Sequence, residues 1–151
     1  MDERLVELGL ELPEPRPPAG NYVAAVRTGS LLYLSGSGPV RPDGSLVTGK
    51  VGDTIDTDTA VEAARLTCLQ LLAVMRRELG TLDRVKQVVK TLGMVNCASG
   101  FNRTPYVIDG CSDLLVEVLG DAGRGARSAV GMAELPRDIA VEIELIVEVI
   151  D

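Results

Sequence analysis

The sequence predicts an α+β domain, with a single β-sheet and two long helices packed on one of its faces. Apolar residues recur at three- and four-residue steps over 57–79 and 105–119, which is the spacing of amphipathic helices. Short runs rich in Val, Leu and Ile lie before, between and after them. The last run, 139–149, alternates between apolar and polar residues over much of its length. With 151 residues and no internal repeat, one core is the economical arrangement.

The N-terminal residues 1–18 are expected to form a short helix and a linker ahead of a domain that spans 19–151. Leucines share one side of an amphipathic pattern over 1–12. The prolines that follow, within 13–18, end this helix and favour an extended chain, because proline lacks an amide donor and restricts the residue before it.

A β-hairpin is predicted next. Apolar runs at 22–27 and 31–35 flank the turn signal Thr-Gly-Ser at 28–30. Glycines and prolines then mark loops over 36–44. The following run, 45–51, is interpreted as a further short strand.

The helix at 57–79 has the clearest boundaries. Thr59 and Glu62 have the spacing of a capping box, which satisfies free amides at the start of a helix. Gly80 ends the helix, because glycine readily adopts the left-handed conformation of a C-terminal cap. The Val-rich run 85–96 then predicts a central strand.

The second helix is expected to begin near Pro105, a residue favoured in the first turn, and to close at Gly120. Two strands complete the chain, at 127–134 and 139–149, and the turn at 135–138 joins them. The order of elements therefore places both helices between strands, as a sheet covered on one face requires.

The final strand indicates how both faces of the sheet are used. One face is apolar and is expected to lie under the helices, with Val141, Ile143, Leu145, Val147 and Val149. The other face mixes small, acidic and apolar residues, namely Ala140, Glu142, Glu144, Ile146 and Glu148. A face open to water has no need of Ile146, so the pattern predicts an oligomer with carboxylates near its interface.

Composition argues against several classes of function. The net charge of −7 and the scarcity of aromatic residues speak against nucleic acid as a partner, because phosphates are bound by Lys and Arg and single strands need stacking platforms. The chain has no histidine. Nucleophile pairs that use histidine and His-bearing metal sites are therefore excluded, and neither a metal nor a cofactor is expected.

The cysteines and the lack of long apolar runs point to the cytoplasm. Three cysteines, widely spaced and without a C-x-x-C pair, are expected to be buried free thiols: Cys68, Cys97 and Cys111. The acidic N-terminal segment shows no signal-peptide pattern, and no stretch is long enough to span a membrane.

Arg127 and Glu142 are the residues best suited to chemistry. A guanidinium binds a carboxylate through two parallel hydrogen bonds, and small residues beside Arg127 leave room for a ligand. Glu142, on a half-buried face, is a candidate general acid and base, because burial raises the pKa of a carboxyl group. An ordinary surface charge is the alternative for both residues. Glu144 and Glu148 share the face of Glu142, and alternation does not choose among the three.

Several stretches resemble the Rid family, also called YjgF and endoribonuclease L-PSP. ARSAVGMAELPRDIAVEIELI, at 126–146, is similar to its C-terminal signature. GNYVAAV, YLSGSGPV and LDRVKQVVKTLGMV are similar, in the same order, to a tyrosine segment, a Ser-Gly motif and a central strand of the family. The resemblance covers about residues 19–150 and indicates a divergent branch.

The resemblance implies a chorismate-mutase-like fold and a homotrimer with clefts between subunits. It also implies hydrolysis of reactive enamines and imines, such as 2-aminoacrylate, to 2-keto acids and ammonia. By position, Arg127 matches the arginine that holds the substrate carboxylate, and Glu142 matches the glutamate that activates water. Tyr22, Ser35 and Gly36 match residues that line the cleft.

Two matched positions depart from the family pattern. Ala129 replaces a frequent cysteine whose backbone carbonyl contributes to the site, and Asp109 replaces a frequent asparagine, where a carboxylate would repel an anion or pair with a cation. Three hypotheses follow: an imine deaminase for 2-imino acids, a non-catalytic trimer that binds small carboxylates or a protein partner, and a ribonuclease. The ribonuclease ranks last, because the acidic chain suits RNA poorly.

Overall fold

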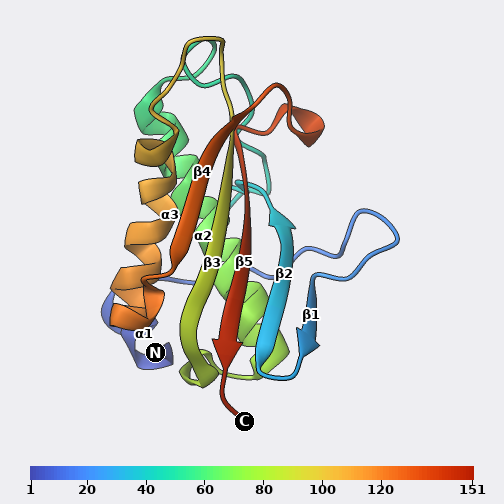
Figure 1. Cartoon of the computed structure of the whole chain (residues 1–151), viewed down its shortest axis with the longest axis vertical. Helices are drawn as coiled ribbons and strands as arrows, with labels where there is room; N and C mark the ends of the chain where they lie inside the picture. Colours follow the sequence, from blue (N-terminus) through green and yellow to red (C-terminus); the bar gives the residue numbers. More distant parts are fainter.

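A computed structural model describes all of residues 1–151 and shows a single mixed sheet with its two long helices on one face (Figure 1). The strands lie in the order β1-β2-β5-β3-β4. Their bounds are Ala25–Thr28 (β1), Leu31–Ser37 (β2), Val85–Asn96 (β3), Ala126–Met132 (β4) and Val141–Val149 (β5). The helices are Asp2–Glu7 (α1), Thr57–Leu79 (α2) and Thr104–Leu119 (α3). The predicted α+β class is confirmed.

The connections between strands explain where the helices lie. Only β3 and β4 pair in parallel, and all other neighbouring strands are antiparallel. A parallel pair needs a crossover between its strands, and α3 supplies it. The hairpin of β1 and β2 turns at Gly29, whose φ of 57° is in the left-handed region that glycine favours. The predicted hairpin is therefore present.

The core fills the space between the sheet and the helices. It is one cluster of 31 buried residues, drawn from all three helices and from β2, β3 and β5 among the strands. In β5 the five apolar residues predicted to lie under the helices are all at most 3% exposed: Val141, Ile143, Leu145, Val147 and Val149. The prediction for this face is confirmed, and the alternate residues of β5 occupy the opposite, uncovered face.

Helix α2 starts with a different cap from the one predicted. Asp56, not Thr59, is the N-cap, and its carboxylate accepts a hydrogen bond from the Thr59 amide at 2.7 Å. An aspartate here also suits the positive end of the helix dipole. The helix ends as predicted at Gly80, which has a φ of 81°. At Gly110 the backbone of α3 touches the backbone of α2, so any side chain there would collide with the Val61 carbonyl.

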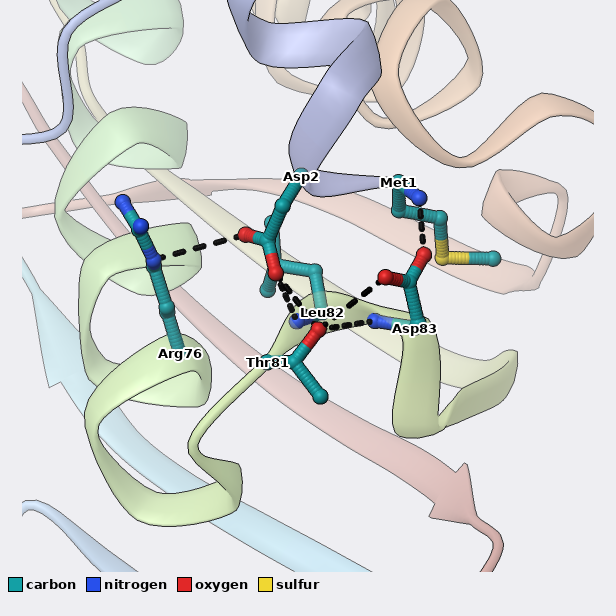
Figure 2. Close-up of polar contacts among 6 residues, drawn as sticks. All are labelled: Met1, Asp2, Arg76, Thr81, Leu82 and Asp83. Carbon is teal, nitrogen blue, oxygen red and sulfur yellow. Dashed lines mark hydrogen bonds and ion pairs between the residues drawn. The ribbon is translucent and has the colours of Figure 1, made fainter.

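The N-terminal helix is shorter than predicted, because it ends at Glu7 rather than near residue 12. Gly9, with a φ of 65°, turns the chain away. Figure 2 shows how the helix is held at its start: the Asp2 carboxylate accepts hydrogen bonds from the Thr81 hydroxyl and the Leu82 amide, and lies 3.3 Å from Arg76. The segment that follows is thereby anchored beside the end of α2.

One further prediction is wrong, and a predicted turn is present with an unusual backbone conformation. Residues 45–51 form no strand: isolated bridges, such as Thr48 to Ile139, and single hydrogen bonds, such as that from the Gly49 amide to the Asp138 carbonyl, connect this loop to other segments. The predicted turn at 135–138 contains a short 3₁₀ segment in which Arg137 and Asp138 both have positive φ, 55° and 56°. Neither feature leaves a signal in the periodicity of apolar residues, because both depend on contacts made by distant parts of the chain.

The three cysteines are all free, Cys68 and Cys111 being buried and Cys97 half-buried. Burial raises the pKa of the Cys68 thiol, with a further contribution from Cys111 nearby, so Cys68 is held in its neutral form. No helix has the length and apolar character that crossing a membrane requires.

Candidate functional site

A cleft of about 740 Å³ lies where β2 runs beyond the end of β1. Its walls come from four parts of the chain: the proline-rich segment and the residues after it (16–24), the end of β2 with its following loop (35–46), helix α2, and the chain entering β5 (136–142). Tyr22, Ser35, Gly36 and Glu142 all line it. Four of the predicted site residues, far apart in sequence, are thus brought together.

Glu142 is the only acidic residue that lines the cleft. It is half-buried, and its pKa is raised above the ordinary value of 4.5, first because burial penalises the charged form and second because Glu144 repels it. No hydrogen bond or cation within the chain offsets this effect. The Glu142 carboxylate thus has no partner within the chain, and a carboxyl group with a raised pKa is suited to proton transfer.

Gly36 leaves room for this carboxylate in its present position. A β-carbon at Gly36 would collide with Oε1 of Glu142. The neighbouring Ser35 has a structural role, because its hydroxyl donates to the Val23 carbonyl at 2.7 Å and its amide donates to the Ala24 carbonyl at 2.9 Å. These bonds tie the chain ahead of β1 to β2 and keep Tyr22, which is 53% exposed, at the rim of the cleft.

Arg127 lies elsewhere, under helix α3. Its Nη1 donates to the Asp109 carboxylate at 2.7 Å and to the Ser112 hydroxyl at 3.1 Å. The arginine side chain is 26% exposed and Asp109 is 45% exposed. Asp109 therefore pairs with a cation, which is one of the two outcomes anticipated for a carboxylate at this position. Both contacts use Nη1 of Arg127. The edge of the guanidinium formed by Nε and Nη2 therefore has no partner within the chain and can bind a carboxylate ligand through two hydrogen bonds.

The register of the sheet places Arg127 and Glu142 on opposite faces. Arg127 pairs with Thr91 of β3, which is buried under the helices, whereas Glu142 pairs with Met94. Side chains alternate along a strand, so positions three residues apart point to opposite sides. One chain on its own does not bring the predicted guanidinium and the predicted carboxylate into a common pocket.

Ala129 is on the same side of β4 as Arg127, two residues further on. Its backbone carbonyl accepts a hydrogen bond from the Thr104 hydroxyl at 3.0 Å. Arg127, Asp109 and Ala129 thus form one group at the α3 edge of the sheet, separate from the group in the cleft.

Sequence reasoning missed two arginines in the cleft, Arg16 and Arg137. Arg16 belongs to the proline-rich linker, and Arg137 to the turn before β5. Prolines and turns carry no periodicity, so only the folded chain shows that these segments meet. No group of three or more acidic, histidine or cysteine side chains is arranged to hold a metal ion.

Comparison with known proteins agrees with the fold and the order of the motifs. A family model described as "YjgF/chorismate mutase-like, putative endoribonuclease" matches residues 2–149. The chain belongs to this family, the YjgF or Rid proteins, and the resemblance noted in the sequence is confirmed.

Among individual relatives, the protein TCP17 of Trypanosoma cruzi is 43% identical over 145 residues, which cover 95% of this chain and 91% of TCP17. The crystal structure of Atu1372 from Agrobacterium tumefaciens, a protein of unknown function, has a TM-score of 0.91 and 42% identity, with 98% of this chain and 91% of that one covered. A crystal structure from Shewanella oneidensis, described as a "putative endoribonuclease", has a TM-score of 0.94, 34% identity and 98% coverage of both chains.

Proposed function

We propose that this protein hydrolyses small reactive 2-imino acids and their enamine tautomers to 2-keto acids and ammonia. The observation that carries the proposal is the half-buried Glu142, which has a raised pKa and no partner within the chain and lies in a cleft with Tyr22, Ser35 and Gly36. An imine carbon is already electrophilic, so neither a metal nor a covalent nucleophile is required. The protein has to hold the acid, place one water and move the two protons of that water to the nitrogen.

In the proposed reaction, Glu142 accepts a proton as water attacks the carbon of the C=N bond. The same carboxyl group returns that proton to the nitrogen, which completes a carbinolamine, and then takes the proton of the carbinolamine hydroxyl and passes it to the amino group. The C–N bond breaks, the C=O bond forms, and a 2-keto acid and ammonia leave. One carboxyl group can serve as base and then as acid, and the raised pKa of Glu142 favours its acting in both roles.

The substrate carboxylate is held in this proposal by Arg127 of a second copy of the chain. Arg127 and Glu142 of one chain are on opposite faces, so assembly has to bring the α3 edge of one subunit to the cleft of the next. The homotrimer that the family resemblance implies would provide such clefts. The matching of Arg127 and Glu142 to the family's functional residues supports this division of labour.

The uncovered face of the sheet supports assembly. Large apolar side chains lie on it in β1, β2 and β4, with Val26 54%, Tyr33 42% and Val130 41% exposed. Met94 and Ile146 are half-buried between them. Apolar residues spread across several strands of one face are typical of an interface between subunits.

The catalytic step can be tested by generating 2-imino acids from monocarboxylic amino acids with an amino-acid oxidase, with semicarbazide present to trap the imine. An active enzyme lowers the rate of semicarbazone formation. Glu142→Gln is expected to lower kcat by about 10²–10⁴-fold, the usual contribution of a general acid–base group. Arg127→Ala is expected chiefly to raise KM. Glu148→Gln is the matched control, because Glu148 pairs with Lys86 and Gln87 outside the cleft.

A wild type that accelerates none of a panel of imines, yet binds 2-keto acids through Arg127, would favour the non-catalytic carboxylate binder.

Assembly is tested by sedimentation. Tyr33→Lys places a charge on the apolar part of the uncovered face and is expected to shift the protein towards monomers and to reduce hydrolysis. A wild type that sediments as a monomer at all concentrations would contradict the shared cleft.

A further inference from the structure

The cleft contains two positive charges that the proposed hydrolysis does not use. Arg16 and Arg137 both line it, and Glu142 is the only acidic residue there. Neither arginine forms an ion pair within the chain. In a chain with a net charge of −7, this cleft is a local site of excess positive charge. A concave surface of one sign attracts ligands of the other sign.

The backbone that carries Arg137 is held in an unfavourable conformation. Arg137 and Asp138 have φ values of 55° and 56°, in the left-handed region that residues with a side chain seldom adopt. Two hydrogen bonds, one from the end of β3 and one from the loop after β2, hold them there. The Nδ2 of Asn96, a fully buried residue, donates to the Asp138 carboxylate at 2.9 Å, and the Gly49 amide donates to the Asp138 carbonyl at 2.8 Å.

Lys50 reinforces this arrangement. Its ammonium group donates to Asn96 Oδ1 at 2.9 Å and also to the backbone carbonyl of Ala133, at the start of the same turn. The turn is thus fastened at both ends to β3 and to the loop after β2. Backbone strain maintained by such contacts is typical of functional positions, and here its effect is to fix the backbone of Arg137 beside the cleft.

Arg16 reaches the cleft by a different route. The chain between α1 and β1 crosses from the α1 side of the molecule to the β1 side (Figure 1). Leu10 and Leu12 pack against the core on the way. The Arg16 guanidinium then donates one hydrogen bond to the Gly44 carbonyl. Its other nitrogens have no partner within the chain, so they are available to an anion.

The volume of the cleft also bears on which ligands it can bind. At about 740 Å³ it is in the range that holds ligands considerably larger than pyruvate. A monocarboxylic 2-imino acid would use Glu142 and one guanidinium, and would leave the other positive groups unpaired.

We infer that Arg137, together with Arg16, forms a second anion-binding position, so that the preferred ligands of this cleft are 2-imino or 2-keto acids with a second acidic group on the side chain. This inference rests on the proposed function for the assignment of the first carboxylate to Arg127. Arg137 acts as a specificity residue: it holds the distal acid, and the reacting carbon stays at Glu142.

The direct test is binding of stable keto acids to the assembled protein, measured by calorimetry. The probes are 2-oxoglutarate and oxaloacetate, which have a second carboxylate, and pyruvate and 2-oxobutyrate, which have none. Wild type is expected to bind the dicarboxylates at least tenfold more tightly. Arg137→Ala is expected to reduce that affinity about 10-fold or more, as the loss of a charge-assisted hydrogen bond does, and to change monocarboxylate affinity less than twofold.

Three controls distinguish recognition of the second carboxylate from a general effect of positive charge. Arg77→Ala removes an exposed arginine at the end of α2, where it pairs with Glu78. This variant is expected to change neither the dicarboxylate nor the monocarboxylate affinity. Arg137→Lys should restore part of the dicarboxylate affinity, because the charge returns without the planar fork. Glutarate, which lacks the keto group, should bind more weakly than 2-oxoglutarate. Equal affinity for mono- and dicarboxylates in wild type, or equal losses of both in Arg137→Ala, would overturn the inference.

A kinetic experiment tests this inference independently of the proposed function. Imines of acidic amino acids can be produced with D-aspartate oxidase, and imines of neutral ones with a D-amino-acid oxidase. Tighter dicarboxylate binding without hydrolysis of any imine would remove the proposed function and leave the inference standing. Hydrolysis of neutral and acidic imines with equal kcat/KM, unaffected by Arg137→Ala, would leave the function standing and overturn the inference.

Discussion

Along β5, the residues that point to the helices are at most 3% exposed, whereas those between them remain half-buried or exposed. The covered face holds only apolar side chains in this strand. The uncovered face of the same strand combines Glu142, Glu144 and Glu148 with Ile146. The first face is completed by the chain's own helices. The second has a composition that suits contact with another subunit, and it contains the carboxylate proposed for catalysis.

This difference shows what each face contributes. The covered face supplies the hydrophobic burial on which stability depends. The uncovered face retains groups that lower the stability of an isolated chain. One is the carboxylate of Glu142, which is half-buried without a partner within the chain. Proteins keep such groups where function requires them, and stability supplied elsewhere in the fold compensates for their cost.

The largest effect expected from the comparison is on stability. Ile143→Ala removes a fully buried side chain from the covered face and is expected to lower the free energy of unfolding by about 2–5 kcal/mol. Ile146→Ala, three residues further on, removes a side chain from the uncovered face and is expected to weaken self-association more than folding. Urea unfolding and sedimentation, each at several protein concentrations, measure the two effects. If Ile143→Ala and Ile146→Ala lowered the free energy of unfolding equally at low protein concentration, the distinction between the two faces would be contradicted.

An intermediate effect is expected at the α3 edge. Asp109→Asn removes the carboxylate that pairs with Arg127 at 2.7 Å and restores the residue frequent in the family. The guanidinium should then bind ligand carboxylates several-fold, up to about tenfold, more tightly, since charge-assisted bonds contribute about 1.5–3 kcal/mol each and one competitor is lost. Calorimetry with 2-oxobutyrate measures this change.

Asp121→Asn is the matched control for that experiment. Asp121 also pairs with an arginine, Arg124, but both are on an exposed turn. This variant is expected to leave ligand affinity unchanged. Weaker binding by Asp109→Asn would show that the carboxylate orients Arg127 rather than competing with the ligand.

The smallest effect expected is a difference in the pH dependence of stability between two glutamates of the uncovered face. The pKa of Glu142 is raised by burial and by Glu144, so its ionisation costs stability as the pH rises through and above 4.5. The pKa of Glu148 is lowered by hydrogen bonds from Lys86 and Gln87, so its ionisation adds stability, which is lost as the pH falls below 4.5.

At neutral pH, Glu142→Gln is therefore expected to be at least as stable as wild type, and Glu148→Gln less stable. At a pH well below 4.5, the difference in stability between Glu142→Gln and wild type should disappear, and that between Glu148→Gln and wild type should shrink. Urea midpoints for both variants between pH 3 and pH 8 check the signs. A Glu142→Gln variant that is less stable than wild type at pH 7 would mean that its carboxylate has a stabilising partner.

Much of the fold could be predicted because it depends on periodicity. The α2 helix, the β3 strand and the covered face of β5 follow from the spacing of apolar residues, and their predicted boundaries are close to those observed. The predictions failed where distant segments decide the outcome. Residues 45–51 are a loop held by bridges to other segments, and Asp56 replaced Thr59 as the helix cap.

The candidate site was predictable only in part, for the same reason. The resemblance to the family indicated Glu142, Tyr22, Ser35 and Gly36, and these residues share one cleft. No pattern in the sequence revealed that Arg127 is on the opposite face of the sheet. That result depends on the pairing register of β3 with both β4 and β5, which a linear pattern does not contain.

The order of apolar and polar residues by itself determined an α+β chain with one covered sheet face, because hydrophobic periodicity sets which side of each element is buried. The family followed from short motifs in the same order. Only the tertiary structure decided which charged groups meet. The Asp109–Arg127 pair and the gathering of Arg16, Arg137 and Glu142 in one cleft arise where loops and strands far apart in sequence come together. Electrostatic partners are set by distance in space, and periodicity along the chain does not encode that distance.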